Sequence, residues 1–330
     1  MQKIINNNIF FGDALDAYAS WESPDLILSD GPYGLGLYPG EPKNVNLLKD
    51  WYKPHVEKWS ELSKPSTTLW FWNTELGWAN VHPLLNDNGW IYKETLTWNK
   101  GKSHIAGKVN SKTIRGLPVV TEIAVRYTRK PIIKADGINT DLKEWLRTEW
   151  LRSKLPLNKA NEACGVKNVA TRKYLTKDDL WYWPPIEAIQ KMSDYCNKNG
   201  DIKGKPYFNL TQQDNWMDLK KQWNDNIKVN LLRAKWNHQH GLTNVWDIPP
   251  LRNQERLKKK NGGSLHINQK PLEIIKKQIE LSTCENDIIW EPFGGTGTVA
   301  FASKELGRKY YVSENNIEYY NIIIERLNNH

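Results

Sequence analysis

Cysteine residues and long apolar runs are scarce in this chain of 330 residues. Its three cysteines, Cys164, Cys196 and Cys284, are far apart and lack the paired spacing of metal sites and disulfide frameworks. No apolar run approaches the ~20 residues of a membrane span, and the N-terminus lacks the apolar segment of a signal peptide. The sequence therefore predicts no metal site, no disulfide and no membrane span, and it favours the reducing cytoplasm.

Little excess positive charge lies at either end of the chain, although the net charge is +9. Residues 1–130 carry 15 basic and 13 acidic side chains, and residues 265–330 carry 7 and 9. Residues 131–264 carry 24 basic and 15 acidic side chains. A basic middle segment suits a polyanion such as DNA, whose phosphates supply much of the affinity. Because solvated basic faces are common, this charge alone does not identify the partner.

The stretch Ser29–Gly34 follows the apolar run Asp25–Leu28, which we interpret as a buried strand that a Gly-Pro turn ends. Ligands of open α/β sheets bind at such carboxyl ends of strands. Asp30 and the Gly31 carbonyl can accept hydrogen bonds from an amino group, and Tyr33 offers a flat face to a planar ring. An ordinary turn uses the same residue types, so a second stretch is needed to favour a binding site.

That second stretch begins with the apolar run Ile288–Trp290, enters a glycine-rich turn and continues into a helix at Val299. Glycines let a backbone approach a ligand closely, and a helix N-terminus favours negative charge. The next predicted strand, Tyr310–Val312, is followed by Glu314, where an acid is placed to bind ribose hydroxyls. The order of strand, glycine turn, helix, strand and acid predicts a nucleotide-binding unit.

Together these stretches resemble the motifs of the DNA amino-methyltransferases, in the permuted order of their beta class. The catalytic signature of that family is Asp/Asn/Ser-Pro-Pro-Tyr/Phe, and its cofactor signature is Asp-Pro-Phe-x-Gly-x-Gly. Here Gly31 replaces the first proline and Glu291 replaces the usual aspartate, and neither change removes a functional group. The resemblance implies an α/β fold, namely a Rossmann-like sheet with helices on both faces. It also implies methyl transfer from S-adenosyl-L-methionine to adenine N6 or cytosine N4.

The resemblance also implies roles for individual residues. The catalytic set would hold the target amine and stack a flipped base, and it comprises Asp30, Gly31, Pro32 and Tyr33. The cofactor-binding set comprises Asp13, Asp30, Lys270, Glu291, Phe293, Gly294, Gly295, Thr296, Gly297, Thr298 and Glu314. Asp13 is equally expected to cap a helix. Lys270 is expected either to pair with the carboxylate of the cofactor or to hold a backbone turn.

The α/β rhythm stops after residue 130, and helical patterns dominate up to about Trp246. We therefore expect a catalytic half over 1–130, a mainly helical target-recognition insertion over 131–260, and a cofactor-binding half over 261–330. Within the insertion, Leu155–Tyr174 resembles a helix-turn-helix, with a plain structural hairpin as the alternative. Its DNA-facing residues would be Asn168, Thr171, Arg172 and Lys173. The aromatic side chains expected in the core include Trp181, Tyr182 and Trp183.

The predicted substrate is duplex DNA, and the resemblance also implies a cognate restriction endonuclease as a partner. Monomer and homodimer both stay open. An aspartate in the first catalytic position, here Asp30, favours adenine over cytosine in this family. A non-catalytic helix-turn-helix protein would explain the basic middle but not the two motifs. A methyltransferase for RNA or small molecules would leave the helix-turn-helix unused, and the Gly-x-Gly-x-x-Gly spacing of a dehydrogenase is absent.

Overall fold

The computed structural model groups the chain into two compact units, Met1–Arg129 with Ala234–His330, and Lys130–Arg233. Residues 234–252, which the sequence analysis assigned to the insertion, therefore lie in the first unit. Within the described residues, no helix is both long and apolar enough to cross a membrane. The structure describes residues 5–6, 8–37, 40–102, 116–178, 180–201, 204–209, 233–252 and 269–329.

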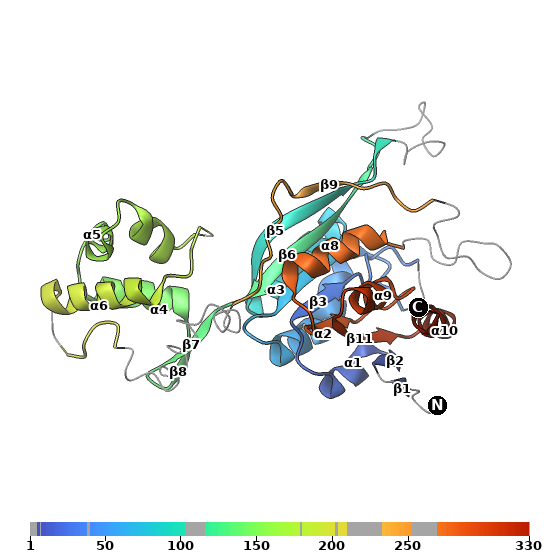
Figure 1. Ribbon diagram of the computed structural model, residues 1–330, viewed down its shortest axis with the longest axis horizontal. Coiled ribbons are helices and arrows are strands. Elements are labelled where there is room, and N and C mark those ends of the chain that lie inside the picture. Colours follow the sequence, from blue (N-terminus) through green and yellow to red (C-terminus); the bar gives the residue numbers. More distant parts are fainter. Residues whose placement is uncertain are drawn as a thin grey trace. The chain divides into compact units, whose positions relative to one another are not determined.

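The first unit is built on a sheet of nine described strands in the order β1-β2-β11-β10-β3-β4-β6-β5-β9 (Figure 1). The neighbours from β2 to β4 run parallel, whereas β4, β6 and β5 pair antiparallel. The strands are β1 (Ile5–Asn6), β2 (Ile9–Phe11), β3 (Leu26–Ser29), β4 (Thr68–Asn73), β5 (Trp90–Asn99), β6 (Thr121–Arg129), β9 (Val245–Asp247), β10 (Ile288–Glu291) and β11 (Lys309–Glu314).

Both faces of this sheet are covered by helices, as predicted for the α/β fold (Figure 1). Successive side chains of a strand point to opposite faces, so Leu26 and Leu28 pack on one side while Ile27 packs on the other. The helices on the Ile27 side are α1 (Ala14–Ala17), α2 (Leu48–Leu62) and α3 (Glu75–Asp87). Those on the opposite side are α8 (Leu272–Ser282) and α9 (Thr298–Glu305), and α10 (Ile317–Asn328) packs against α9 at the β2 side.

Strand β9 was not predicted, because three residues are too few for a periodic pattern. It pairs in parallel with the end of β5, with Trp98 opposite Trp246. The indole N–H of Trp98 donates to the carbonyl oxygen of Ile248 at 2.6 Å, and Trp246 is buried. This pairing brings residues 245–247 into the sheet of the first unit.

The second unit is mainly helical, but it begins with a hairpin that the sequence analysis missed. Strands β7 (Ile132–Ala135) and β8 (Ile138–Asp141) pair antiparallel across Asp136 and Gly137, whose φ angles are +52° and +79°. An Asp-Gly pair is a common hairpin turn because both positions need positive φ. The helices that follow are α4 (Leu142–Arg152), α5 (Lys159–Cys164) and α6 (Ile186–Asn199), around a core that includes Trp150, Ile189 and Met192.

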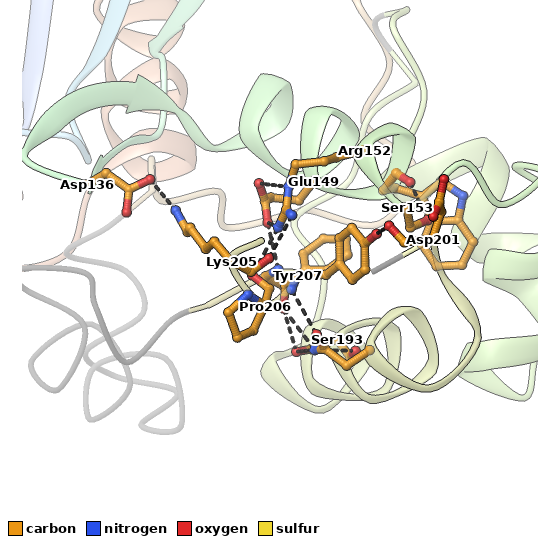
Figure 2. A network of polar contacts seen from close by, with 12 residues as sticks. Asp136, Glu149, Arg152, Ser153, Ser193, Asp201, Lys205, Pro206 and Tyr207 are labelled. Carbon is orange, nitrogen blue, oxygen red and sulfur yellow. Dashed lines mark hydrogen bonds and ion pairs between the residues drawn. The ribbon is translucent and has the colours of Figure 1, made fainter. Parts of the chain in front are cut away.

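A buried acid, Glu149 on α4, ties the end of the described part of this unit to its core (Figure 2). Its carboxylate lies 2.7 Å from a guanidinium nitrogen of Arg152 and accepts the backbone N–H of Phe208 at 2.7 Å. Arg152 also donates to the carbonyl oxygens of Lys205 and Pro206. Because a buried carboxylate needs partners, this network holds residues 205–208 against α4.

Candidate active site

The two motifs predicted to cooperate lie at the ends of two neighbouring strands, β3 and β10. Strand β3 pairs in parallel with β10, with Ile27 opposite Trp290. Asp30 follows the last residue of β3, and Phe293 lies two residues beyond the end of β10. Since parallel neighbours end at the same edge of a sheet, the motifs meet although more than half of the chain separates them.

The contact between the two motifs is direct. A methyl group placed on Gly31 would lie 2.6 Å from the ring of Phe293 and 2.6 Å from the Tyr52 hydroxyl. The space that a side chain would need is therefore occupied, which gives a physical reason for glycine at this position. The next carbonyl oxygen, that of Pro32, accepts hydrogen bonds from Tyr52 at 3.1 Å and from Asn73 at 3.0 Å. The turn after β3 is thus held from two other elements.

The Asp30 carboxylate belongs to a network of four charged side chains. The Lys270 ammonium lies 2.9 Å from each Asp30 oxygen and 2.7 Å from Glu122 Oε1. The other Glu122 oxygen is 2.7 Å from the Lys100 ammonium. The Tyr33 hydroxyl lies 2.9 Å from Asp30 Oδ1 and 2.5 Å from Glu122 Oε1. Two acids and two ammonium groups therefore balance each other beside the catalytic turn.

Burial and charge together set the protonation of this network. Burial disfavours the charged form of Lys270, but Asp30 and Glu122 outweigh it and raise the pKa of Lys270 to about 12. Burial alone would raise the pKa of Glu122, whereas Lys270 and Lys100 lower it to about 2. Burial, Asp30 and Glu122 all raise the pKa of the Tyr33 hydroxyl. Lys270 and Glu122 are therefore charged, and Tyr33 is a neutral phenol, at neutral pH.

A second acid organises the loop that follows the catalytic turn. The Glu41 carboxylate accepts backbone N–H groups from Tyr33 at 2.9 Å, Leu35 at 3.3 Å and Leu37 at 2.7 Å. Gly36 also donates its N–H to the Pro42 carbonyl at 3.1 Å. The loop is thus folded around one carboxylate, and its first bond fixes the backbone of Tyr33.

On the cofactor side, Glu291 faces the start of α9. Its buried carboxylate accepts the N–H groups of Ala300 at 2.9 Å and Val299 at 3.3 Å. These donors lie in the first turn of the helix, where N–H groups lack partners within the helix. Burial raises the pKa of Glu291 to about 8, although both donors oppose the rise. In this structure the acid of the cofactor motif caps a helix.

Glu314, at the end of β11, lies against the glycine-rich turn. Its Oε2 accepts the N–H of Gly295 at 2.7 Å, and its Oε1 accepts the N–H of Asn316 at 2.7 Å. Burial raises the pKa of Glu314 to about 7. Gly295 and Gly297 have φ angles of +52° and +72°, which favour glycine. The predicted acid and the predicted turn are therefore in contact.

The other residues of the predicted cofactor set lie in several different surroundings. A methyl group on Gly294 would lie 2.7 Å from Val312, and Thr296 and Thr298 are buried beside it in the turn. Asp13 caps α1 by accepting the N–H of Leu15 at 2.9 Å, which is the alternative role predicted for it. The partners of Lys270 are the side chains of Asp30, Glu122 and Tyr33, so it does not hold a backbone turn here. Its pairing with the carboxylate of the cofactor stays a prediction.

The predicted DNA-facing residues lie after α5, whose C-cap is Gly165. The predicted second helix is only a five-residue π-helical turn, Ala170–Tyr174. Asn168 and Arg172 are exposed, and Lys173 is half-buried. Thr171 is half-buried, and its hydroxyl donates to the Leu157 carbonyl at 2.8 Å and so holds the turn in place. Its contact with DNA stays a prediction.

An aromatic side chain that was predicted to be in the core lies beside these residues instead. Tyr182 is 62% exposed, and the ammonium of Lys173 is 5.8 Å from the centre of its ring. The backbone N–H of Tyr182 donates to the Lys173 carbonyl at 2.7 Å. The second unit therefore presents an exposed aromatic ring together with basic and amide side chains.

Glu122 and Lys100 are site residues that were not predicted from the sequence. Lys100 directly follows β5, and Glu122 is the second residue of β6, its antiparallel neighbour. Asp30 and Glu314 were predicted because each lies at the end of a strand. Lys100 and Glu122 also lie at strand ends. This signal was not usable from the sequence, because the antiparallel pairing that aligns these ends is a tertiary feature.

Comparison with known proteins gives the family. The model of the N6_N4_Mtase family, described as DNA methylase, matches residues 24–325. The chain belongs to this N6/N4 DNA methylase family. Like its family, it is a DNA methyltransferase with adenine-N6 or cytosine-N4 specificity, and S-adenosyl-L-methionine is its methyl donor.

Individual relatives of this N6/N4 DNA methylase are distant. The type II methyltransferase M.HindIII of Haemophilus influenzae is 23% identical over 293 residues, which cover 88% of this chain and 73% of that protein. M.HinfI, from the same organism, is 34% identical over 91 residues, or 28% of this chain and 25% of that protein.

Two solved structures share the fold. The PvuII DNA methyltransferase (cytosine-N4-specific) has a TM-score of 0.54 at 13% identity, covering 97% of this chain and 86% of that one. The complex of M1.HpyAVI with SAM has a TM-score of 0.50 at 17% identity, covering 97% and 98%. At these identities the likeness shows the fold alone.

Proposed function

We propose that this DNA methyltransferase modifies the exocyclic amine of a flipped base in duplex DNA, with adenine N6 as its target. The observation that carries this proposal is the contact between the two motifs. The Asp30 turn and the glycine-rich turn leave neighbouring parallel strands, and Gly31 packs directly on Phe293. An amine held by one turn then faces a methyl donor held by the other.

The residues at the second turn fit a nucleoside cofactor. The Glu314 carboxylate accepts the backbone N–H groups of Gly295 and Asn316 on different oxygens, and the N–H of Asn315 also stabilises its charged form. A carboxylate oxygen has a second acceptor position, so Glu314 retains the capacity to bind ribose hydroxyls. We assign the remaining contacts to Phe293, Gly294–Thr298 and Asp13. When bound, S-adenosyl-L-methionine supplies an electrophilic methyl group on its sulfonium.

The catalytic turn supplies orientation. The lone pair of an aromatic exocyclic amine is conjugated into its ring, so the amine is a poor nucleophile. Hydrogen bonds from its two N–H groups to Asp30 and the Gly31 carbonyl draw it toward tetrahedral geometry. With the cofactor bound, the nitrogen would attack the methyl carbon in line as the methyl–sulfur bond breaks, sulfur would keep the electron pair as a neutral thioether, and the nitrogen would lose one proton to solvent. Positioning would supply most of the acceleration. Because the amine is out of reach inside a duplex, the base is flipped out and stacked on Tyr33.

The direct test of this assignment replaces Asp30. Asp30→Asn keeps the shape but weakens acceptance from the amine, so methyl transfer falls by about 10²–10³-fold. Cofactor affinity, measured by calorimetry, stays near the wild-type value. Glu57→Gln, an exposed change on α2, is the matched control and keeps full activity. Full activity of Asp30→Asn would remove Asp30 from the mechanism.

The choice of adenine rests on the aspartate in the first catalytic position. Cytosine N4 is the second candidate, because its amine makes the same two hydrogen bonds. Mass spectrometry of nucleosides from methylated duplex DNA separates the two products. N4-methylcytosine alone would overturn the adenine assignment, and transfer to RNA but not to DNA would overturn the substrate class.

Target recognition is assigned to the second unit. Its exposed Asn168 and Arg172, together with Lys173 and Tyr182, combine amide, cation and aromatic groups of the kind that contact bases and phosphates. The type II names of M.HindIII and M.HinfI further suggest a restriction endonuclease with the same target sequence as a partner. Protection of DNA methylated by this protein from such an endonuclease is the corresponding test.

A further inference from the structure

The Lys270 ammonium group is unusually constrained for a lysine. Its side chain is 4% exposed, and a buried ammonium requires acceptors for its three N–H groups. Three side chains lie within reach, namely Asp30, Glu122 and the Tyr33 hydroxyl at 3.1 Å. These contacts use every donor that Lys270 has, so the direction of its bond to Asp30 is fixed.

The two acids of this network, Glu122 and Asp30, have different roles. Glu122 is 13% exposed and contacts only cations and Tyr33 in the described network, whereas Asp30 is 31% exposed. Glu122 therefore supplies the counter-charge that the buried Lys270 ammonium needs. Glu122 is in turn paired with the Lys100 ammonium. Asp30 keeps an accessible side, and in this network its Oδ2 keeps one acceptor position for an incoming amine.

We infer that Glu122 and Lys270 are positioning residues. They keep the Asp30 carboxylate charged and oriented toward the target amine. This inference rests on the proposed function. Lys270 orients both Asp30 oxygens, and Glu122 prevents Asp30 from serving as the sole counter-ion of a buried cation. Neither residue needs to touch the substrate.

Other ionisable groups also face Asp30, and the pH behaviour of the site includes them. Those that interact with Asp30 are Tyr33 on the catalytic turn, Tyr52 on α2, Lys270 before α8 and Glu291 at the end of β10. Glu122 on β6 joins them through Lys270 and Tyr33, and Lys100 after β5 joins them through Glu122.

The test compares the pH dependence of single-turnover methyl transfer, at saturating DNA and cofactor, across three variants. Lys270→Met leaves Asp30 and Glu122 as two neighbouring carboxylates with only the Lys100 ammonium as counter-ion, so the pair takes up a proton more readily. We expect the acid limb of its rate profile to move to higher pH, with a lower rate at the plateau. Glu122→Gln should lower the rate without this movement, because Lys270 still faces Asp30.

The double variant Lys270→Met with Glu122→Gln removes one charge of each sign. Its acid limb should return toward the wild-type position, although its plateau stays low. A purely structural role predicts equal loss at every pH and no return in the double variant. An unmoved acid limb in Lys270→Met would overturn the inference.

Controls separate folding and function from positioning. Glu122→Asp and Lys270→Arg keep the charges, so they should retain the wild-type acid limb even where the rate falls. Lys277→Met disrupts an exposed ion pair with Glu273 on α8 and should leave the profile unchanged. If wild-type protein makes no methylated DNA, the proposed function fails. If it does, and only the acid limb of Lys270→Met stays in place, the positioning role alone fails.

Discussion

The two units of this protein use charge in opposite ways. In the first unit, the acids and lysines beside the catalytic turn are largely buried and paired, as Glu122 with Lys270 shows. In the second unit, the candidate DNA-facing residues Asn168 and Arg172 are exposed. Chemistry on an amine needs a charge held in one direction, whereas binding of phosphates needs cations that solvent and DNA can reach. This difference fits the proposed division into a catalytic unit and a recognition unit.

The largest expected effect tests whether the units depend on each other. Trp150 is fully buried in the second unit, so Trp150→Ala should cost about 3–5 kcal/mol of its unfolding free energy. Duplex binding should then be lost while calorimetry still detects cofactor binding. Trp290→Ala, the counterpart in the first unit, should abolish cofactor binding. Equal loss of cofactor binding in both variants would contradict the division.

The free energy of unfolding of the first unit is expected to change by about 3 kcal/mol with pH. Burial lowers the pKa of His55 to about 4. Between pH 6.5 and 4 the unfolded chain binds a proton that the native chain does not, so the free energy of unfolding falls. Above pH 6.5 this contribution is constant. His55→Gln should flatten that part of the profile in urea unfolding, whereas exposed His238→Gln should not.

A smaller effect tests the contact that joins the two motifs. Gly31→Ala forces a methyl group against Phe293 and Tyr52, and overpacking of this kind costs about 1–3 kcal/mol. Methyl transfer and thermal stability should both fall. Adding Phe293→Leu should restore part of the stability, and Gly116→Ala, where nothing lies within 4 Å, should be neutral. No change in Gly31→Ala would show that the motifs are not closely packed.

The smallest effect is expected on the recognition surface. Arg172→Ala should weaken duplex binding by about 1 kcal/mol and lower the salt dependence of binding by about one charge if it contacts a phosphate. A relaxed sequence preference would instead indicate a base contact. Lys198→Ala, an exposed change on α6, is the matched control. If Arg172→Ala and Lys198→Ala bind duplex DNA equally well, this surface has only a structural role.

Local patterns predicted much of the first unit. The runs before Asp30 and Glu291 are strands, the helix after Pro271 spans Leu272–Ser282, and the fold is the predicted α/β sheet. These elements are long or are ended by glycine and proline, so their signals are local. Short elements such as β9 and the β7–β8 hairpin were missed. The predicted recognition helix was too long, because Ala170–Tyr174 forms only a single π-helical turn.

By itself, the sequence determined the two motifs, the strands that precede them and the family they resemble, because strand ends and glycine turns are local patterns of neighbouring residues. Only the tertiary structure decided that Lys270 faces Asp30, that Glu122 and Lys100 complete the network, and that Glu291 caps a helix. Such pairings join residues up to 240 positions apart. They depend on which strands become neighbours, and no local pattern of residues records that choice.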